Sequence, residues 1–277
     1  MTRCIGAHLS MAGGLVSAAK NMQEMGGNAL QIFSGSPRSW ARKPLSQVDF
    51  SPFLKFCKEQ DFGPTFIHAL YLVNLASEKP ELVQNSINSI IYDLKFSAAI
   101  AGAGVVVHLG SHLGKGFASA KQQVVDSVIE ILKNTPENST FIIENSAGQN
   151  GKIASNFAEI REILDELSQY KQRVGWCFDT CHAFANGYKL DSIDEEIDKY
   201  SLWDSLKVIH LNDSRDVFAS GRDRHENIGE GAIGKQNMKR FLLDQRYAKY
   251  PLILEVPGFD NEGPDKKNID IVKEMMQ

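Results

Sequence analysis

The chain has 277 residues, which is enough to bury a sizeable core in one large domain or two small ones. Its 43% hydrophobic and 23% charged residues are ordinary for a globular protein. No apolar stretch approaches the ~20 residues of a membrane span, and the N-terminal "MTRCIGAHLS" has no signal-peptide core. We therefore expect no membrane association and no export.

Cysteine content and net charge bear on the cellular compartment and on nucleic-acid binding. The four cysteines are too few and too scattered for a disulfide framework, which favours a reducing cytoplasm. The net charge of −4 gives no general attraction to nucleic acid. Any DNA binding would therefore depend on local basic loops.

Short apolar runs recur along the chain, at 4–9, 29–33, 65–69, 105–109, 141–145, 175–179, 207–211 and 252–256. Each run is rich in Ile, Val, Leu or Phe, as is typical of parallel strands buried on both faces. Helical patterns lie between most of them, such as 82–103 and 119–134, and the second carries Val124, Val128, Ile131 and Leu132 on one face. Eight strands alternating with helices predict an α/β fold, a TIM (β/α)8 barrel that forms a single domain over 1–277. The alternative is a doubly wound open sheet, but "GAHLSMAGGL" lacks the Gly-rich phosphate turn that such a sheet normally has after its first strand.

Ionisable residues lie at or just after the end of six of these runs: His68, His108, Glu144, Asp179, His210 and Glu255. Three more candidates follow in loops that we expect at the same face, namely His182, Asp223 and His225. Taken singly, each could be a hydrogen-bonded structural residue or a helix cap. However, five of the seven histidines fall in this set. Because barrel enzymes place their chemistry at the C-terminal face, the set predicts an active site there.

The residue types indicate a metal centre. Imidazoles mixed with carboxylates suit zinc, manganese or iron, whereas calcium and magnesium prefer oxygen alone. Nine candidates are too many for one four-coordinate ion, so two or three metals fit better. Clustered metals of this kind are typical of phosphoester hydrolysis.

The segment "CFDTCHAFANGY" (177–188) also contains two cysteines, Cys177 and Cys181. Their spacing of four, with no second pair, is poor for a zinc finger or a redox motif. We predict that both pack as small buried residues and that Asp179 and His182 carry the chemistry.

Several longer motifs occur in order along almost the whole chain: "GAHLSMAGGL", "HALYLVNLAS", "HLGSH", "IENSAGQ", "FDTCHAFANGY", "IHLNDS", "DRHENIGEGAIG" and "ILEVPG". With these motifs the chain resembles the endonuclease IV family, the zinc-dependent apurinic/apyrimidinic endonucleases of base-excision repair. The resemblance implies a TIM barrel with three Zn²⁺ ions in a deep pocket. It also implies hydrolysis of duplex DNA on the 5′ side of abasic sites and repair of 3′-blocked ends. A monomer is the plain expectation.

The resemblance also implies roles for individual residues. His68, His108 and Glu144 would hold one zinc; Glu144 would bridge to a second, completed by Asp179, His210 and Glu255; His182, Asp223 and His225 would hold the third. Glu144 and Glu255 would be catalytic. Tyr71 and Leu72 would press on the duplex, and Arg38, in the loop "SGSPRSWARK" that also carries Trp40, Arg42 and Lys43, would fill the vacated stack. Apart from the resemblance, the position of His112 just past the fourth apolar run predicts a contact with a metal ligand or a phosphate, and His8 would either do the same or be a core residue.

Two other functions are weighed against this one. A sugar isomerase or epimerase on the same barrel would need fewer ligands, mostly carboxylates, and no DNA-contacting loops. A non-catalytic lesion-binding protein would have closed, structural metal sites, whereas nine residues shared among three ions leave positions open for water and substrate.

Overall fold

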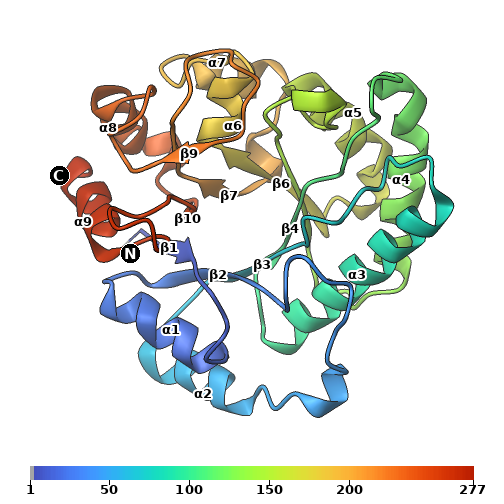
Figure 1. Ribbon diagram of the computed structural model, residues 1–277, viewed down its shortest axis with the longest axis horizontal. Coiled ribbons are helices and arrows are strands. Elements are labelled where there is room, and N and C mark those ends of the chain that lie inside the picture. The colour runs from blue at the N-terminus through green and yellow to red at the C-terminus, as the bar shows by residue number, and fades with distance from the viewer. Residues whose placement is uncertain (1–2) are drawn as a thin grey trace.

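A computed structural model describes residues 3–277, and its centre is a closed barrel of eight parallel strands (Figure 1). Around the barrel the strands run β1 (Ile5–His8), β2 (Ala29–Phe33), β3 (Thr65–His68), β4 (Gly104–Val107), β5 (Phe141–Glu144), β6 (Val174–Asp179), β7 (Leu206–His210) and β10 (Leu252–Leu254), which pairs again with β1. This closure confirms the predicted TIM barrel and excludes the open sheet. The remaining strands, β8 (Asp213–Ser214) and β9 (His225–Glu226), form a small antiparallel pair after β7.

Helices surround the barrel (Figure 1). They are α1 (Leu15–Glu24), α2 (Ser51–Gln60), α3 (Pro80–Ala99), α4 (Phe117–Lys133), α5 (Phe157–Glu166), α6 (Thr180–Ala185), α7 (Ile193–Lys199), α8 (Lys235–Leu243) and α9 (Lys266–Met275). On α4 the predicted apolar face is buried against the rest of the core. Within residues 3–277, no helix has both the length and the apolar character needed to cross a bilayer.

A separate apolar layer fills the inside of the barrel. It takes one residue from each of seven strands: Ala29, Phe66, Val106, Ile142, Cys177, Val208 and Ile253, all fully or almost fully buried. The eighth strand contributes Gly6, where a Cβ would overlap the carbonyl oxygen of Ala29. Cys177 is thus a packing residue of the barrel interior, as predicted. This layer is the floor on which the polar residues lie.

Candidate metal centre

Eight polar side chains form a ring directly above the interior layer. Side chains alternate along a strand, so the residue two positions after an interior residue points into the barrel again, one layer nearer the C-terminal face. Adding two to each interior position gives His8, Gln31, His68, His108, Glu144, Asp179, His210 and Glu255. The parallel topology therefore brings six of the predicted ligands together, along with two further residues.

The segments after β6 and β7 supply the other three predicted ligands, and His182 lies on a helix rather than in the loop expected from the sequence. His182 lies on α6, which begins directly after β6, and the carboxylate of Asp179 caps this helix by accepting a hydrogen bond from the His182 backbone N–H. Asp223 and His225 lie in the long segment after β7. The buried carboxylate of Asp213 organises this segment, because it accepts hydrogen bonds from several backbone N–H groups between residues 229 and 234.

The nine predicted ligands fall into three groups, two of which share a residue. His68, His108 and Glu144 form one; Glu144, Asp179, His210 and Glu255 a second; His182, Asp223 and His225 a third. Within each group the potential ligand atoms lie within 4.8 Å of one another. Glu144 belongs to two groups, as a bridging carboxylate would. Cys181 also lies close to Asp179 and His225, but its thiol is directed at the backbone carbonyl of Arg224.

Three of the histidines are held by their outer ring nitrogen. Nδ1 of His68 donates to the carbonyl of Ala69 (2.7 Å), Nδ1 of His182 to that of Asn145 (3.0 Å), and Nδ1 of His225 to that of Glu255 (3.1 Å). Each bond fixes the ring orientation and leaves Nε2 facing the carboxylates. This is the arrangement that metal-binding histidines adopt in proteins.

In two of these histidines the inner nitrogen has no ordinary hydrogen-bond partner. Nε2 of His182 and Nε2 of His225 are buried and make no hydrogen bond within residues 3–277. Yet Oδ1 of Asp223 lies 2.9 Å from the first and 3.5 Å from the second. Donor atoms that converge without bonding one another are what a shared cation requires, so these residues fit a metal.

Burial and neighbouring charges shift the pKa values of side chains in the candidate metal centre. Burial lowers the pKa of His108 to about 3, which keeps this imidazole neutral, as a metal ligand must be. Burial also opposes charge on His182, but Asp179 and Asp223 raise its pKa well above the ordinary value. Burial alone would raise the pKa of Glu255, but His210 and His8 hold it well below the usual range. The Glu255 carboxylate therefore remains charged and attracts cations.

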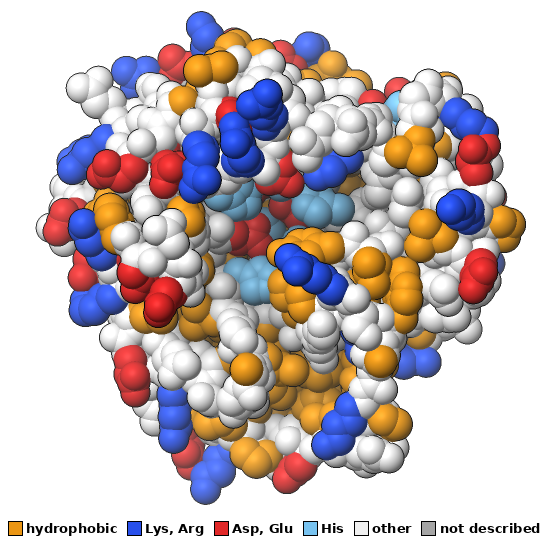
Figure 2. Space-filling view, viewed as in Figure 1, with side chains coloured by type: hydrophobic (Ala, Val, Ile, Leu, Met, Phe, Trp, Pro, Cys, Tyr) orange, Lys and Arg blue, Asp and Glu red, His pale blue; other side chains and the backbone are white. Residues whose placement is uncertain are grey.

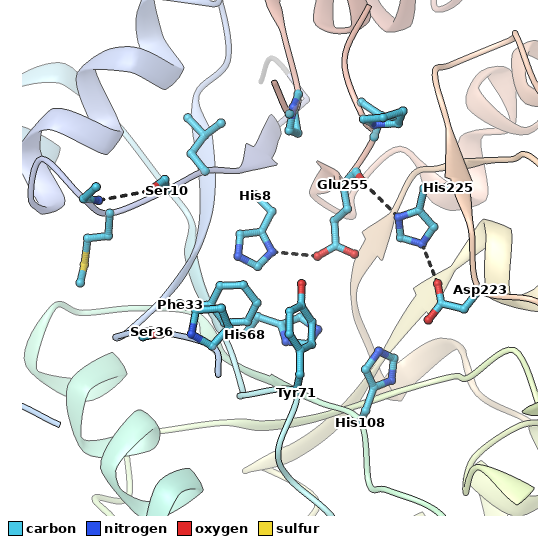
Figure 3. A pocket seen from close by; sticks show the side chains of 18 of the residues that line it. His8, Ser10, Phe33, Ser36, His68, Tyr71, His108, Asp223, His225 and Glu255 are labelled. Carbon is cyan, nitrogen blue, oxygen red and sulfur yellow. Dashed lines mark hydrogen bonds and ion pairs between the residues drawn. The ribbon is translucent and has the colours of Figure 1, made fainter. Parts of the chain in front are cut away.

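The ring opens into a cavity of about 990 Å³. Figure 2 shows histidines and carboxylates at the bottom of this hollow. In Figure 3, His8, Glu255, His225 and Asp223 lie along one wall, with Tyr71 and His108 across from them. The candidate metal centre is therefore accessible from one side.

Residues 19–276 match the family model described as xylose isomerase-like TIM barrel. Two curated relatives named probable endonuclease 4 are those of Thermosipho melanesiensis, 39% identical and covering 93% of each chain, and Halothermothrix orenii, 36% identical over 97% of this chain and 99% of the relative. The crystal structure of endonuclease IV from Thermus thermophilus superposes with a TM-score of 0.87 at 31% identity, covering 99% of this chain and 98% of that one. The chain belongs to the endonuclease IV family.

The residues expected to contact DNA lie at the rim of this endonuclease IV cavity or near it. Tyr71 is 66% exposed and packs edge-on against Phe33, with ring centroids 5.1 Å apart. Leu72 is half-buried against the core, and Arg38 is exposed. Arg42, from the same loop as Arg38, turns inward instead and points at α3.

His112 lies in the loop after β4. Its Nδ1 accepts hydrogen bonds from the backbone N–H groups of Gly114 (3.1 Å) and Gly116 (3.0 Å), so it shapes that loop. Within residues 3–277 none of its hydrogen bonds reaches the eight polar side chains above the interior layer. A contact with a metal ligand or a phosphate stays a prediction.

Sequence reasoning missed Gln31 and did not decide whether His8 contacts a metal ligand or is a core residue. Nε2 of Gln31 donates to Oε1 of Glu255 (2.7 Å), while its Oε1 accepts from Nε2 of His210 (2.9 Å). Nδ1 of His8 lies 2.9 Å from the same Glu255 oxygen. Both residues stand two positions after an interior residue of their strands, and a polar glutamine inside "ALQIF" was the available signal.

Sequence reasoning also missed two asparagines that hold Asp179. Nδ2 of Asn212 donates to Oδ2 of Asp179 (2.7 Å), and Oδ1 of Asn145 accepts from the Asp179 backbone N–H (2.6 Å). Asn145 and Asn212 lie one and two positions, respectively, after predicted ligands.

Proposed function

We propose that this endonuclease IV homologue is a DNA-repair enzyme that hydrolyses the phosphodiester on the 5′ side of an abasic site in double-stranded DNA. The products would be a 3′-hydroxyl and a 5′-deoxyribose phosphate, and 3′-blocked ends would be a second class of substrate. The enzyme would act as a monomer. The observation that carries the proposal is the convergence of three groups of His, Asp and Glu at the bottom of one open cavity.

We further propose that the three groups hold three zinc ions. His68, His108 and Glu144 would hold the first; Glu144, Asp179, His210 and Glu255 the second; His182, Asp223 and His225 the third. Zinc bound here would supply hydroxide at neutral pH and stabilise charge on the phosphate and on the departing oxygen. Four carboxylates against six positive charges leave the centre positive, which favours a phosphodiester although the whole chain carries −4.

The side chains around the cavity support hydrolysis rather than lyase chemistry. A lyase needs an amine, usually a lysine of lowered pKa, to form a Schiff base with the sugar aldehyde. Among residues 3–277 no lysine lines this cavity. Lys152 reaches the edge of the ring, but its Nζ is paired with Oδ2 of Asp223 at 3.4 Å.

The rim offers groups that suit a damaged duplex. An abasic nucleotide has lost its base, so extruding it costs less unstacking than extruding an intact nucleotide. We propose that the exposed ring of Tyr71, with Leu72 beside it, presses on the duplex and that exposed Arg38 enters the gap.

The test is to incubate the purified protein, without added magnesium, with a duplex labelled at a single abasic site. We expect a 3′-hydroxyl product, no covalent adduct after borohydride treatment, and loss of cleavage after prolonged chelation. A trapped adduct or a 3′-unsaturated aldehyde would overturn the hydrolytic mechanism, and absence of any cleavage by zinc-loaded protein would overturn the proposed function.

A further inference from the structure

One buried carboxylate lies outside the metal centre. Asp93, on α3, has no exposed surface, and its Oδ2 has no hydrogen-bond partner within residues 3–277. Burial raises its pKa to about 6, although the hydrogen bond from Ser34 and the charge of Arg42 oppose this shift. A charged group in this setting costs stability, so it calls for an explanation.

Asp93 interacts with both ends of the loop that carries Arg38, through a hydrogen bond at one end and an ion pair at the other. At the start of the loop, directly after β2, the hydroxyl of Ser34 donates a hydrogen bond to Oδ1 of Asp93. At the far end, Nη2 of Arg42 lies 3.8 Å from the same oxygen, and the Arg42 side chain is only 9% exposed. The carboxylate thus closes residues 34–42 into a loop whose two ends meet at α3.

Two neighbours of Asp93 on α3 add to this attachment. The hydroxyl of Tyr92 donates to the carbonyl of Lys43 (2.7 Å), and the Arg42 guanidinium lies 5.6 Å from the centre of the Tyr92 ring. The hydroxyl of Ser89 accepts from Nη2 of Arg42 (3.4 Å). Arg42 also donates to the carbonyl of Ser39 inside the loop (3.0 Å), which stiffens the segment around Arg38.

The same helix holds the loop that carries Tyr71. The buried hydroxyl of Ser86 accepts a hydrogen bond from the backbone N–H of Asn74 (2.9 Å). In addition, Tyr71 packs against Phe33, which directly precedes Ser34. Helix α3 is therefore a common base for the two loops that present Tyr71 and Arg38.

We propose that Asp93 is a positioning residue for DNA recognition: its carboxylate ties the Arg38 loop to α3 and so holds Arg38 at a fixed place relative to Tyr71. The inference rests on the proposed function, since it concerns the same DNA-contacting rim. The physical gain is preorganisation, because a loop that is already ordered loses less conformational entropy when the duplex binds. Preorganisation of this loop also explains why the unfavourable buried charge of Asp93 is found beside it.

The attachment of the loop by Asp93 can be measured without DNA, by amide hydrogen exchange. Asp93→Ala should release the loop, so backbone amides in residues 35–43 should exchange with deuterium about tenfold faster or more, while amides of the strands keep their protection. Ser34→Ala should give a change in the same direction, and serves as the second variant if Asp93→Ala folds poorly. Asp93→Asn keeps a group that can bond Ser34 and should show a smaller change. Asp126→Asn, at an exposed aspartate on the neighbouring α4, is the matched control and should behave as wild type.

The effect of Asp93 on DNA binding is tested by a double-mutant cycle with Arg38→Ala, in which the affinity of each zinc-loaded variant for the abasic duplex is measured. Each single variant should bind the abasic duplex about tenfold more weakly with unchanged zinc content. The double variant should bind the abasic duplex no more weakly than the weaker-binding single variant, because Asp93 acts through Arg38. Additive losses, or unchanged loop exchange in both Asp93→Ala and Ser34→Ala, would overturn the positioning role. If exchange accelerates but wild type itself shows no preference for the abasic duplex, the proposed function fails while the loop attachment stands.

Discussion

Gln31 links Glu255 and His210 across the inside of the barrel. Its amide donates to one of these candidate ligands and accepts from the other, and it is fully buried. Because an amide has separate donor and acceptor ends, this single side chain fixes the orientation of the Glu255 carboxylate and of the His210 ring. It thus supports two candidate ligands of the same metal.

We predict that Gln31→Met lowers zinc affinity or turnover by about 10- to 100-fold, the range seen when a partner of a metal ligand is removed. The methionine has a similar length, so the fold should persist. Competition with a zinc chelator measures the affinity. Gln84→Met, at an exposed position of α3, is the control and should leave both quantities unchanged.

Glu255→Gln should reduce turnover by more than about 100-fold, because it changes a candidate ligand itself rather than a partner. The amide has the same shape but loses the charge that His8, Gln31 and His210 surround. Steady-state cleavage of the abasic duplex measures this effect, and circular dichroism checks the fold. A rate near that of wild type would remove Glu255 from the catalytic residues.

Metal content distinguishes the third group from the other two. Wild type should bind close to three zinc ions per chain, and Asp223→Ala close to two, because Asp223 belongs only to the group with His182 and His225. Elemental analysis of dialysed protein gives the count. One metal in wild type, or mainly magnesium, would refute the three-zinc centre.

The cysteines should not matter for metal binding. Cys177 lies in the apolar interior layer, and burial raises the pKa of both Cys177 and Cys181 to about 12, so neither offers a thiolate at neutral pH. The double variant Cys177→Ser with Cys181→Ser should keep the zinc content of wild type. Loss of zinc would show that Cys181, which lies near Asp179 and His225, is a ligand.

Asp93 should make stability depend on pH. Its pKa is raised on folding from about 4 to about 6, so the folded state binds this proton more tightly. The stabilising contribution is then fully present below about pH 4 and is lost as the pH rises through 6. Asp93→Asn cannot titrate, so its stability relative to wild type should increase between pH 4.5 and 7.5 by about 2 kcal/mol. Denaturant unfolding of both zinc-loaded proteins at each pH measures the difference, and a constant difference would show that Asp93 keeps an ordinary pKa.

The sequence alone determined the barrel and the choice of candidate ligands. All eight strands were visible as apolar runs, because a parallel strand buried on both faces must be apolar along its length. Residues such as His68 and Glu144 stood out because an ionisable group at the end of such a strand has no packing reason to be there. The closed topology then required these strand ends to meet at one face.

Only the tertiary structure decided which side chains support the ligands. Gln31 looks like a polar interruption of a strand, and its contacts come from strands more than 170 positions away in the sequence. The inward turn of Arg42, predicted to lie in a DNA-contacting loop, depends on Asp93 of α3, about fifty positions later. Local periodicity reports which face of an element is buried. It does not report which distant group meets that face, because barrel closure and the packing of helices against loops set those pairings.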